Sequence, residues 1–165
     1  MAVREIVLYP DPRLREACRP LDPSGDAAQG IVQDLWDTLD AHVGVGLSAP
    51  QIGHMVRAIV VDATRAKHPC LHHGRIALLN PVIVLAEGKT TFREGCMSVP
   101  DLVAHIQRAE RLTLAGLLPD GRQVTISPEG FEAVIVQHEI DHLDGVLFID
   151  RVRRARDLKP RTSGG

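Results

Sequence analysis

Two histidines stand four residues apart in the segment His138–His142, whose sequence is HEIDH. On a helix, residues at this spacing lie one turn apart on the same face, so both imidazoles can bind one metal ion. Glu139 follows the first histidine, where its carboxylate can take a proton from a water molecule at the metal. The alternative is a pair of structural histidines, but buried imidazoles without a partner are costly and a metal removes that cost.

A third ligand has to come from elsewhere in the chain. No Glu, His or Cys follows His142; Asp144, Asp150 and Asp157 stay open as downstream ligands, and Cys96 is the best candidate upstream. One thiolate and two imidazoles leave one tetrahedral position open for water, as catalytic sites do. Such a ligand set suits Zn²⁺ or Fe²⁺ better than Mg²⁺ or Ca²⁺.

Two helices are predicted, one on each side of a β-rich middle. The first covers residues 26–43, where apolar residues recur every four positions and predict an amphipathic helix: Ile31, Leu35, Leu39 and Val43. The second is predicted to start near Ser127, which can cap it, and to stop near Gly145. The second helix carries the His138–His142 segment, and its apolar stripe is expected to point both imidazoles into the core.

Between the two helices, runs rich in Val, Ile and Leu predict strands at residues 57–63, 76–86, 102–106, 112–118 and 123–126. Pro119-Asp120-Gly121 predicts a hairpin turn between the last two, because Pro and Gly supply the backbone angles of a turn. The sequence therefore predicts an α+β domain, with antiparallel strands around a central metal-binding helix and an N-terminal amphipathic helix.

The bulk properties fit one soluble domain. The chain has 165 residues, of which 44% are apolar and 24% charged, and no run approaches the roughly 20 apolar residues that span a bilayer. No signal peptide is recognisable at the N-terminus, so we expect a cytoplasmic protein without membrane contact. Three widely spaced cysteines do not indicate a disulfide framework. The net charge of −2 argues against nucleic-acid binding by the protein as a whole.

The C-terminal end differs from the rest in charge. From Arg151 to Gly165 there are six basic residues and one acidic residue, a net charge of +5. We expect residues 1–152 to form the catalytic domain and residues 153–165 to be a basic, flexible tail. The hypothesis that this tail contacts the ribosome rests on its charge alone.

Three segments resemble the motifs of the peptide deformylase family: GVGLSAPQ at residues 44–51, EGCMS at 94–98 and QHEIDHL at 137–143. Their order and spacing agree with the family, and the resemblance covers about residues 3–152. It implies that Cys96, His138 and His142 hold one divalent metal ion. The ion would be Fe²⁺ in the cell, with Zn²⁺, Ni²⁺ or Co²⁺ in preparations.

The resemblance also implies the reaction, which is hydrolysis of the N-formyl group from the formyl-methionine of a peptide or nascent chain. Glu139 would be the general acid and base, while the Gln51 side-chain amide and the Met97 backbone N–H would stabilise the oxyanion. Gly46 would let the substrate backbone come close. The pocket for the methionine side chain would be lined by Val45, Glu94, Phe131, Val134 and Ile135.

The chain departs from the family pattern at three positions. Ser48 replaces the more usual Ala, Met97 replaces Leu, and Val103 stands where the family commonly has an Arg that helps to orient the peptide. Because of Val103, a second hypothesis is a related hydrolase for a different small N-acyl substrate. A third is a non-catalytic metal-binding protein, but a purely structural metal needs neither Glu139 nor Gln51.

Overall fold

The computed structural model describes residues 2–162. Its two α-helices are α1 (Asp26–Asp40) and α2 (Gly130–Leu143). The strands are β1 (Gly46–Ser48), β2 (Ala58–Asp62), β3 (Arg75–Glu87), β4 (Thr90–Cys96), β5 (Val99–Arg108), β6 (Arg111–Leu117), β7 (Gln123–Ile126) and β8 (Leu158–Pro160). Short 3-10 turns connect several of these elements. The α+β prediction is confirmed. None of the helices formed by the described residues is long and apolar enough to cross a membrane.

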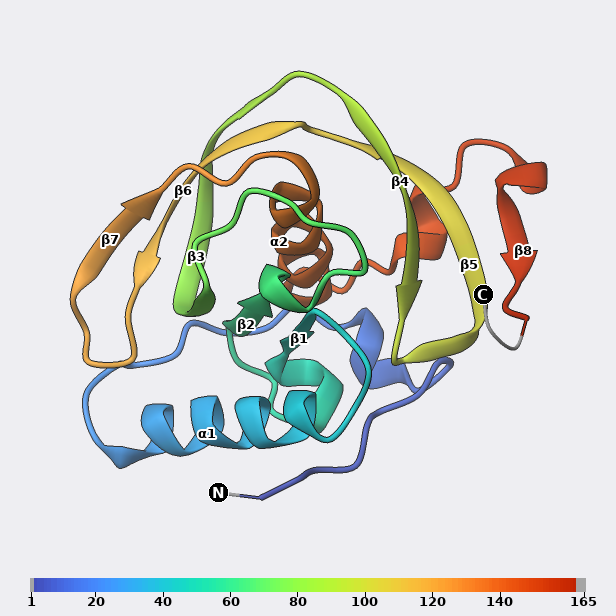
Figure 1. Ribbon diagram of the computed structural model, residues 1–165. Coiled ribbons are helices and arrows are strands. Elements are labelled where there is room, and N and C mark those ends of the chain that lie inside the picture. Colours follow the sequence, from blue (N-terminus) through green and yellow to red (C-terminus); the bar gives the residue numbers. More distant parts are fainter. Residues whose placement is uncertain (1, 163–165) are drawn as a thin grey trace.

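Two antiparallel sheets surround the second helix. One has the strand order β1-β2-β3-β6-β7, and the other has the order β4-β5-β8. In Figure 1, α2 lies at the centre, the long strands β3 and β6 pass on one side of it, and β4 and β5 curve past on the other. The predicted hairpin between β6 and β7 is present, and Gly121 in its turn has a φ of +91°.

The central helix is buried on nearly all sides. Ala133 and Val136 of α2 belong to a cluster with Ile59, Leu78 and Leu114 of the larger sheet. Because the protein surrounds this helix, it has almost no solvent-facing side, and its polar residues also lie in the interior. This enclosure explains why both histidines of α2 point into the protein.

The first helix packs against β1 and β2, and its end differs from the prediction. Leu35 and Leu39 are fully buried, but Val43 is 99% exposed and lies beyond the helix, which ends at Asp40. The Arg65 guanidinium donates hydrogen bonds to the carbonyl oxygens of Leu39 and His42. These bonds occupy carbonyl groups at the helix end. The apolar spacing continues to Val43, although the helix has already ended three residues earlier.

The second helix begins later than predicted, and Ser127 does not cap it. The carbonyl oxygen of Pro128 accepts a hydrogen bond from Leu112 N–H, and Glu129 pairs with Arg111. This segment therefore runs along β6 in an extended form. The helix starts at Gly130, whose φ of +60° suits glycine.

Three strands were not predicted: β1, β4 and β8. In β4 the buried residues are Glu94 and Cys96. The strand therefore lacks the alternation of apolar and polar residues by which a strand is recognised in a sequence. The strand β8 lies within residues 153–165, the segment that the sequence analysis expects to be a flexible tail. Strand β8 pairs with β5 through Leu102, Val103 and Ala104, because β5 offers it a free edge. The rest of the expected tail includes residues 163–165, which lie outside the described residues.

Gly145, just after α2, offers a test of this packing. Its φ is +75°, and a Cβ atom built on it would lie 2.5 Å from the carbonyl oxygen of Arg15. We expect Gly145→Ala to lower the free energy of unfolding by about 2–5 kcal/mol, from left-handed strain and overpacking together. Gly30→Ala is the matched control, because a Cβ there meets nothing within 4 Å, and a helical Ala should stabilise by about 0.5–1 kcal/mol. Urea unfolding of both variants compares them, and equal effects would contradict this assignment.

Candidate active site

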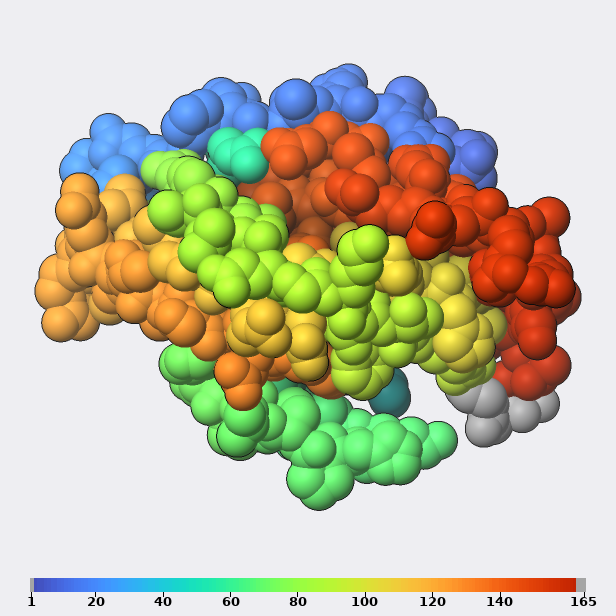
Figure 2. Space-filling view, turned by 90° about the horizontal axis from the view of Figure 1, so that it is seen from above, coloured from blue at the N-terminus to red at the C-terminus, as the bar shows by residue number. Residues whose placement is uncertain are grey.

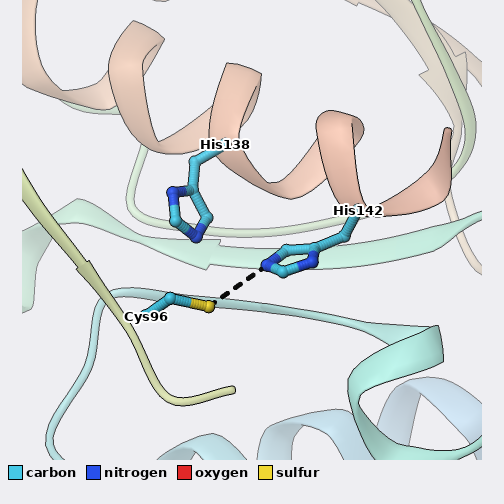
Figure 3. A group of neighbouring side chains, drawn as sticks. All are labelled: Cys96, His138 and His142. Carbon is cyan, nitrogen blue, oxygen red and sulfur yellow. Dashed lines mark hydrogen bonds between the residues drawn. The ribbon is translucent and has the colours of Figure 1, made fainter. Parts of the chain in front are cut away.

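Three potential metal ligands meet where α2 faces the end of β4. One ligand atom from each of Cys96, His138 and His142 lies within 4.8 Å of the other two. Figure 3 shows the two imidazoles descending from α2 toward the sulfur, and Cys96 Sγ lies 3.3 Å from His142 Nε2. Among residues 2–162 this is the one group of His, Cys, Asp or Glu side chains placed to hold a metal ion.

The chemistry of these side chains fits a divalent cation. His142 is 1% exposed, and its Nδ1 atom has no hydrogen-bond partner among residues 2–162. Burial lowers the pKa of His142 well below its usual range. The neutral imidazole, which is the form that binds metals, is therefore present at neutral pH. Thiolate and imidazole donors also suit Zn²⁺ or Fe²⁺.

The downstream aspartates left open by the sequence lie elsewhere. Asp144 forms an ion pair with Arg57 at 2.8 Å, and Asp157 forms one with Arg154 at 3.4 Å. Asp150 pairs with the Arg15 guanidinium. Each of these carboxylates is thus already neutralised by an arginine, and none belongs to the three-ligand group.

A buried network of charged side chains holds His138 in place. Glu94 Oε1 lies 2.9 Å from His138 Nδ1, so this nitrogen carries the proton and Nε2 is left for a metal. Arg108 donates two hydrogen bonds to Glu94, at 2.6 and 2.9 Å, and a third to Asp141 at 2.9 Å. Burial opposes the charged carboxylate, but hydrogen bonds from His138 and Arg108 outweigh it and lower the pKa of Glu94. Arg151 donates hydrogen bonds to both carboxylate oxygens of Asp141.

The sequence did not indicate Arg108 or Asp141 as part of this site. A signal was present, since Arg108 is the one charged residue on the inward face of β5 after Ala104 and Ile106. An inward-facing arginine among apolar residues needs a buried carboxylate as its partner. The partner could not be identified without the fold, because Glu94 lies on a strand that was not predicted.

Glu139 is 4% exposed, and its Oε1 atom accepts no hydrogen bond from any residue that the structure describes. Burial raises its pKa to about 7 from an ordinary value of 4.5. A Cβ atom on Gly46 would lie 2.9 Å from Glu139 Oε2, so the glycine leaves room for this carboxylate. A carboxyl that titrates near neutral pH can both accept and donate a proton at physiological pH.

The raised pKa of Glu139 predicts a pH dependence of stability in the metal-free protein. The folded state keeps a proton that the unfolded state loses above about pH 4.5, so this contribution to stability is lost as pH rises through 7. Gln does not titrate. We therefore expect the free energy of unfolding of the Glu139→Gln variant, measured relative to that of the wild type, to increase by about 3 kcal/mol from pH 5 to pH 8. Denaturant unfolding with a chelator present measures this gain, and a difference independent of pH would refute it.

Gln51 is held rigidly beside the sulfur. Its Oε1 accepts hydrogen bonds from Ser48 N–H at 3.0 Å and from the Ser48 hydroxyl at 2.9 Å. Its Nε2 therefore points the other way, to Ser98 Oγ at 3.1 Å and Cys96 Sγ at 3.5 Å. Ser48, which departs from the family pattern, thus helps to fix the orientation of this amide.

A pocket with a volume of about 320 Å³ opens from this group of residues to the surface. Figure 2 shows the hollow between the green loop after β2 and the strands β4 and β5. The side chains around it include every residue that the sequence placed at the site except His142: Val45, Gly46, Gln51, Glu94, Cys96, Met97, Phe131, Val134, Ile135, His138 and Glu139. Arg65, Lys67, Arg93 and Arg161 also line it and were not predicted.

Known proteins resemble the chain along nearly its whole length. Residues 3–157 match the family model described as polypeptide deformylase. The peptide deformylase of Desulforudis audaxviator is 46% identical over 152 residues, covering 92% of this chain and 94% of that protein. The crystal structure of a peptide deformylase from Legionella pneumophila superposes with a TM-score of 0.85 at 38% identity, over 94% of this chain and 89% of that one.

A third relative was solved with a peptide. The Met-Ala-Ser-bound peptide deformylase of Acinetobacter baumannii is 28% identical, with a TM-score of 0.84 over 92% of this chain and 99% of that one. Sequence and fold thus agree with these deformylases over nearly the whole of the chain. The chain belongs to the polypeptide deformylase family.

Proposed function

We propose that this protein hydrolyses the N-formyl group from the formyl-methionine of newly made polypeptides and releases formate. One observation carries the proposal: a buried carboxyl, Glu139, stands beside the Cys96, His138 and His142 group at the inner end of an apolar pocket. Membership of the deformylase family supports it. A purely structural metal site would need neither the adjacent carboxyl nor the pocket.

Cys96, His138 and His142 would hold one divalent cation. When bound there, such a cation supplies a Lewis acid that makes a water molecule nucleophilic at neutral pH. We propose Fe²⁺ for the cell, with Zn²⁺, Ni²⁺ or Co²⁺ able to replace it in preparations, since thiolate and imidazole ligands suit these ions. Glu94 would keep His138 in the tautomer that leaves Nε2 available.

The protein's own groups would handle the charge and the protons of the reaction. Glu139 Oε2 would take the proton of the attacking water and pass it to the departing amine nitrogen. Negative charge would develop on the formyl oxygen, and Gln51 Nε2 with Met97 N–H would stabilise it as fixed donors. The two hydrogen bonds from Ser48 support this role, because they hold the amide in position before the substrate arrives.

The methionine side chain would lie in the apolar part of the pocket. Val45, Phe131, Val134 and Ile135 line this part, which fits an unbranched thioether. Glu94, predicted as part of the same lining, is engaged by Arg108 and His138, so we propose that it acts on the metal ligand rather than on the substrate. Gly46 would bring the substrate backbone close to Glu139.

Acyl selectivity distinguishes this function from that of a hydrolase for another small N-acyl substrate. We expect anaerobically prepared, Fe²⁺-loaded enzyme to deformylate formyl-Met-Ala-Ser at least about 100-fold faster than it deacetylates acetyl-Met-Ala-Ser. The acetyl group carries a methyl group in place of the formyl hydrogen atom, and this methyl group would have to fit beside Cys96 and Gln51. Formate and acetate release are followed in parallel. Equal rates, or acetate release alone, would favour the other N-acyl hydrolase.

The site of action we propose is the cytoplasm, where nascent chains are made, with contact to the ribosome through the basic C-terminal residues. Arg156 and Lys159 are exposed and have no ion-pair partner among residues 2–162, whereas Arg151 is held by Asp141. Reversing both charges with Glu should abolish co-sedimentation with ribosomes at low salt but leave peptide turnover intact. Unchanged co-sedimentation would remove the ribosome contact from the proposal.

A further inference from the structure

The mouth of the pocket is lined by three cations that nothing neutralises among the residues the structure describes. Lys67 lies on the loop after β2, Arg93 on β4, and Arg161 directly after β8. All three are exposed, and no hydrogen bond or ion pair to a described residue engages their charged groups. Arg65, the fourth basic residue of the lining, differs because it binds Asp40 and the carbonyl oxygens at the end of α1.

Arg161 lies beside the end of β4 that carries Cys96. The pairing of β8 with β5 positions it, and its N–H donates to the Asp101 carbonyl oxygen at 2.8 Å. Its guanidinium lies over the backbone of Gly95, next to the ligand Cys96: a Cβ atom on Gly95 would be 2.7 Å from Arg161 Nη2 and 3.6 Å from Val103 Cγ1. Glycine at 95 and valine at 103 thus leave the space that this guanidinium occupies.

The acidic residues of the pocket do not offset these cations at the mouth. Glu94 and Glu139 are the acidic residues of the lining, and both are buried, at 6% and 4% exposure. Glu94 is already paired with Arg108. The entrance is therefore positively charged on a chain whose net charge is −2, and a charged cleft attracts ligands of the opposite sign.

We propose that Arg161, with Lys67 and Arg93, makes the enzyme select formyl-methionyl peptides with an acidic side chain in the residues that follow methionine. This inference rests on the proposed deformylase function. The methionine side chain enters the apolar interior, so the next residues of the peptide pass the mouth, where these cations lie. An acidic side chain gains attraction there and a basic one is repelled, and both effects weaken as salt screens the exposed charges.

The test compares formyl-Met-Ala-Asp, formyl-Met-Ala-Ser and formyl-Met-Ala-Lys, all amidated at the C-terminus so that only one side chain changes the charge. We expect kcat/KM for the Asp peptide to exceed that for the Lys peptide by about 5- to 20-fold at low salt, mainly through KM. Arg161→Gln should reduce this ratio by about 2- to 4-fold. Arg156→Gln, which removes a charge from the same segment outside the pocket, should leave the ratio unchanged.

Binding of the deformylated products separates this inference from the proposed reaction. Calorimetry of the metal-loaded protein with Met-Ala-Asp-amide and Met-Ala-Lys-amide should give the same order of affinity and the same loss in Arg161→Gln, whether or not turnover is seen. Equal affinities in the wild type overturn the proposal. An equal loss for both peptides in Arg161→Gln also overturns it, because the guanidinium would then bind the peptide backbone without selecting charge. No turnover of any formyl peptide would count against the proposed function alone.

Discussion

The Glu139→Ala variant is expected to keep its metal ion and to lose about 10²- to 10⁴-fold in kcat for formyl-Met-Ala-Ser. The carboxyl is buried beside the three ligands but does not belong to the ligand group, so its removal leaves the metal site complete. Its pKa of about 7 lets it accept a proton and return it within one catalytic cycle. Metal analysis and formate release on the same sample check both halves of the prediction.

The matched control for this variant is Glu132→Gln. Glu132 is also a buried carboxyl on α2, but it contacts His73 outside the pocket. We expect turnover within about twofold of the wild type for this control, because Glu132 touches no reacting group. A metal-loaded Glu139→Ala variant that keeps more than about a tenth of wild-type turnover would remove Glu139 from the proposed proton transfer.

Replacing Arg108 by Met is expected to cost about 3–5 kcal/mol of folding free energy at neutral pH, because it removes the buried cation that two carboxylates share. The guanidinium is 3% exposed and bonds both Glu94 and Asp141. The bonds to Glu94 help lower the pKa of this group, so the stabilisation they provide is present above its ordinary pKa of 4.5 and is lost as pH falls through the depressed value. The loss in Arg108→Met should therefore shrink in acid.

The same variant should also weaken metal binding. Glu94 orients His138, and loss of such support beyond the ligands typically costs about 10- to 100-fold in metal affinity. Arg111→Met is the matched control, since Arg111 is half exposed and pairs with surface glutamates, and its effect should stay within about 0.5 kcal/mol. Equal destabilisation of the two variants, measured by urea unfolding across pH, would contradict the role given to Arg108.

Part of the candidate site follows from local sequence patterns, whereas one strand that carries it does not. The two histidines could be placed on one helix face from their spacing alone, because helical geometry is local. The strand that carries Cys96 could not be recognised, since its inward positions hold Glu94 and Cys96 instead of apolar side chains. A residue that serves the metal site in this way removes the hydrophobic signal that would reveal its strand.

Long-range backbone pairing explains two further differences between expectation and structure. Arg161 was grouped with a flexible tail because its segment is basic and short of apolar residues, yet β8 docks on the free edge of β5 through backbone hydrogen bonds. Likewise, Ser127 has the chemistry of a helix cap, but pairing of the following residues with β6 delays the helix. Backbone pairing depends on which edge is available, and a single sequence does not record this.

The central claim is that one metal ion held by Cys96, His138 and His142 makes this chain a deformylase. The most direct test is stepwise anaerobic addition of Fe²⁺ to chelator-treated protein, with formate release from formyl-Met-Ala-Ser measured at each step. We predict that turnover rises in proportion to bound iron and saturates at about one ion per chain, as a mononuclear catalytic site requires. Turnover without bound metal, or one bound ion per chain without formate release, would contradict the claim.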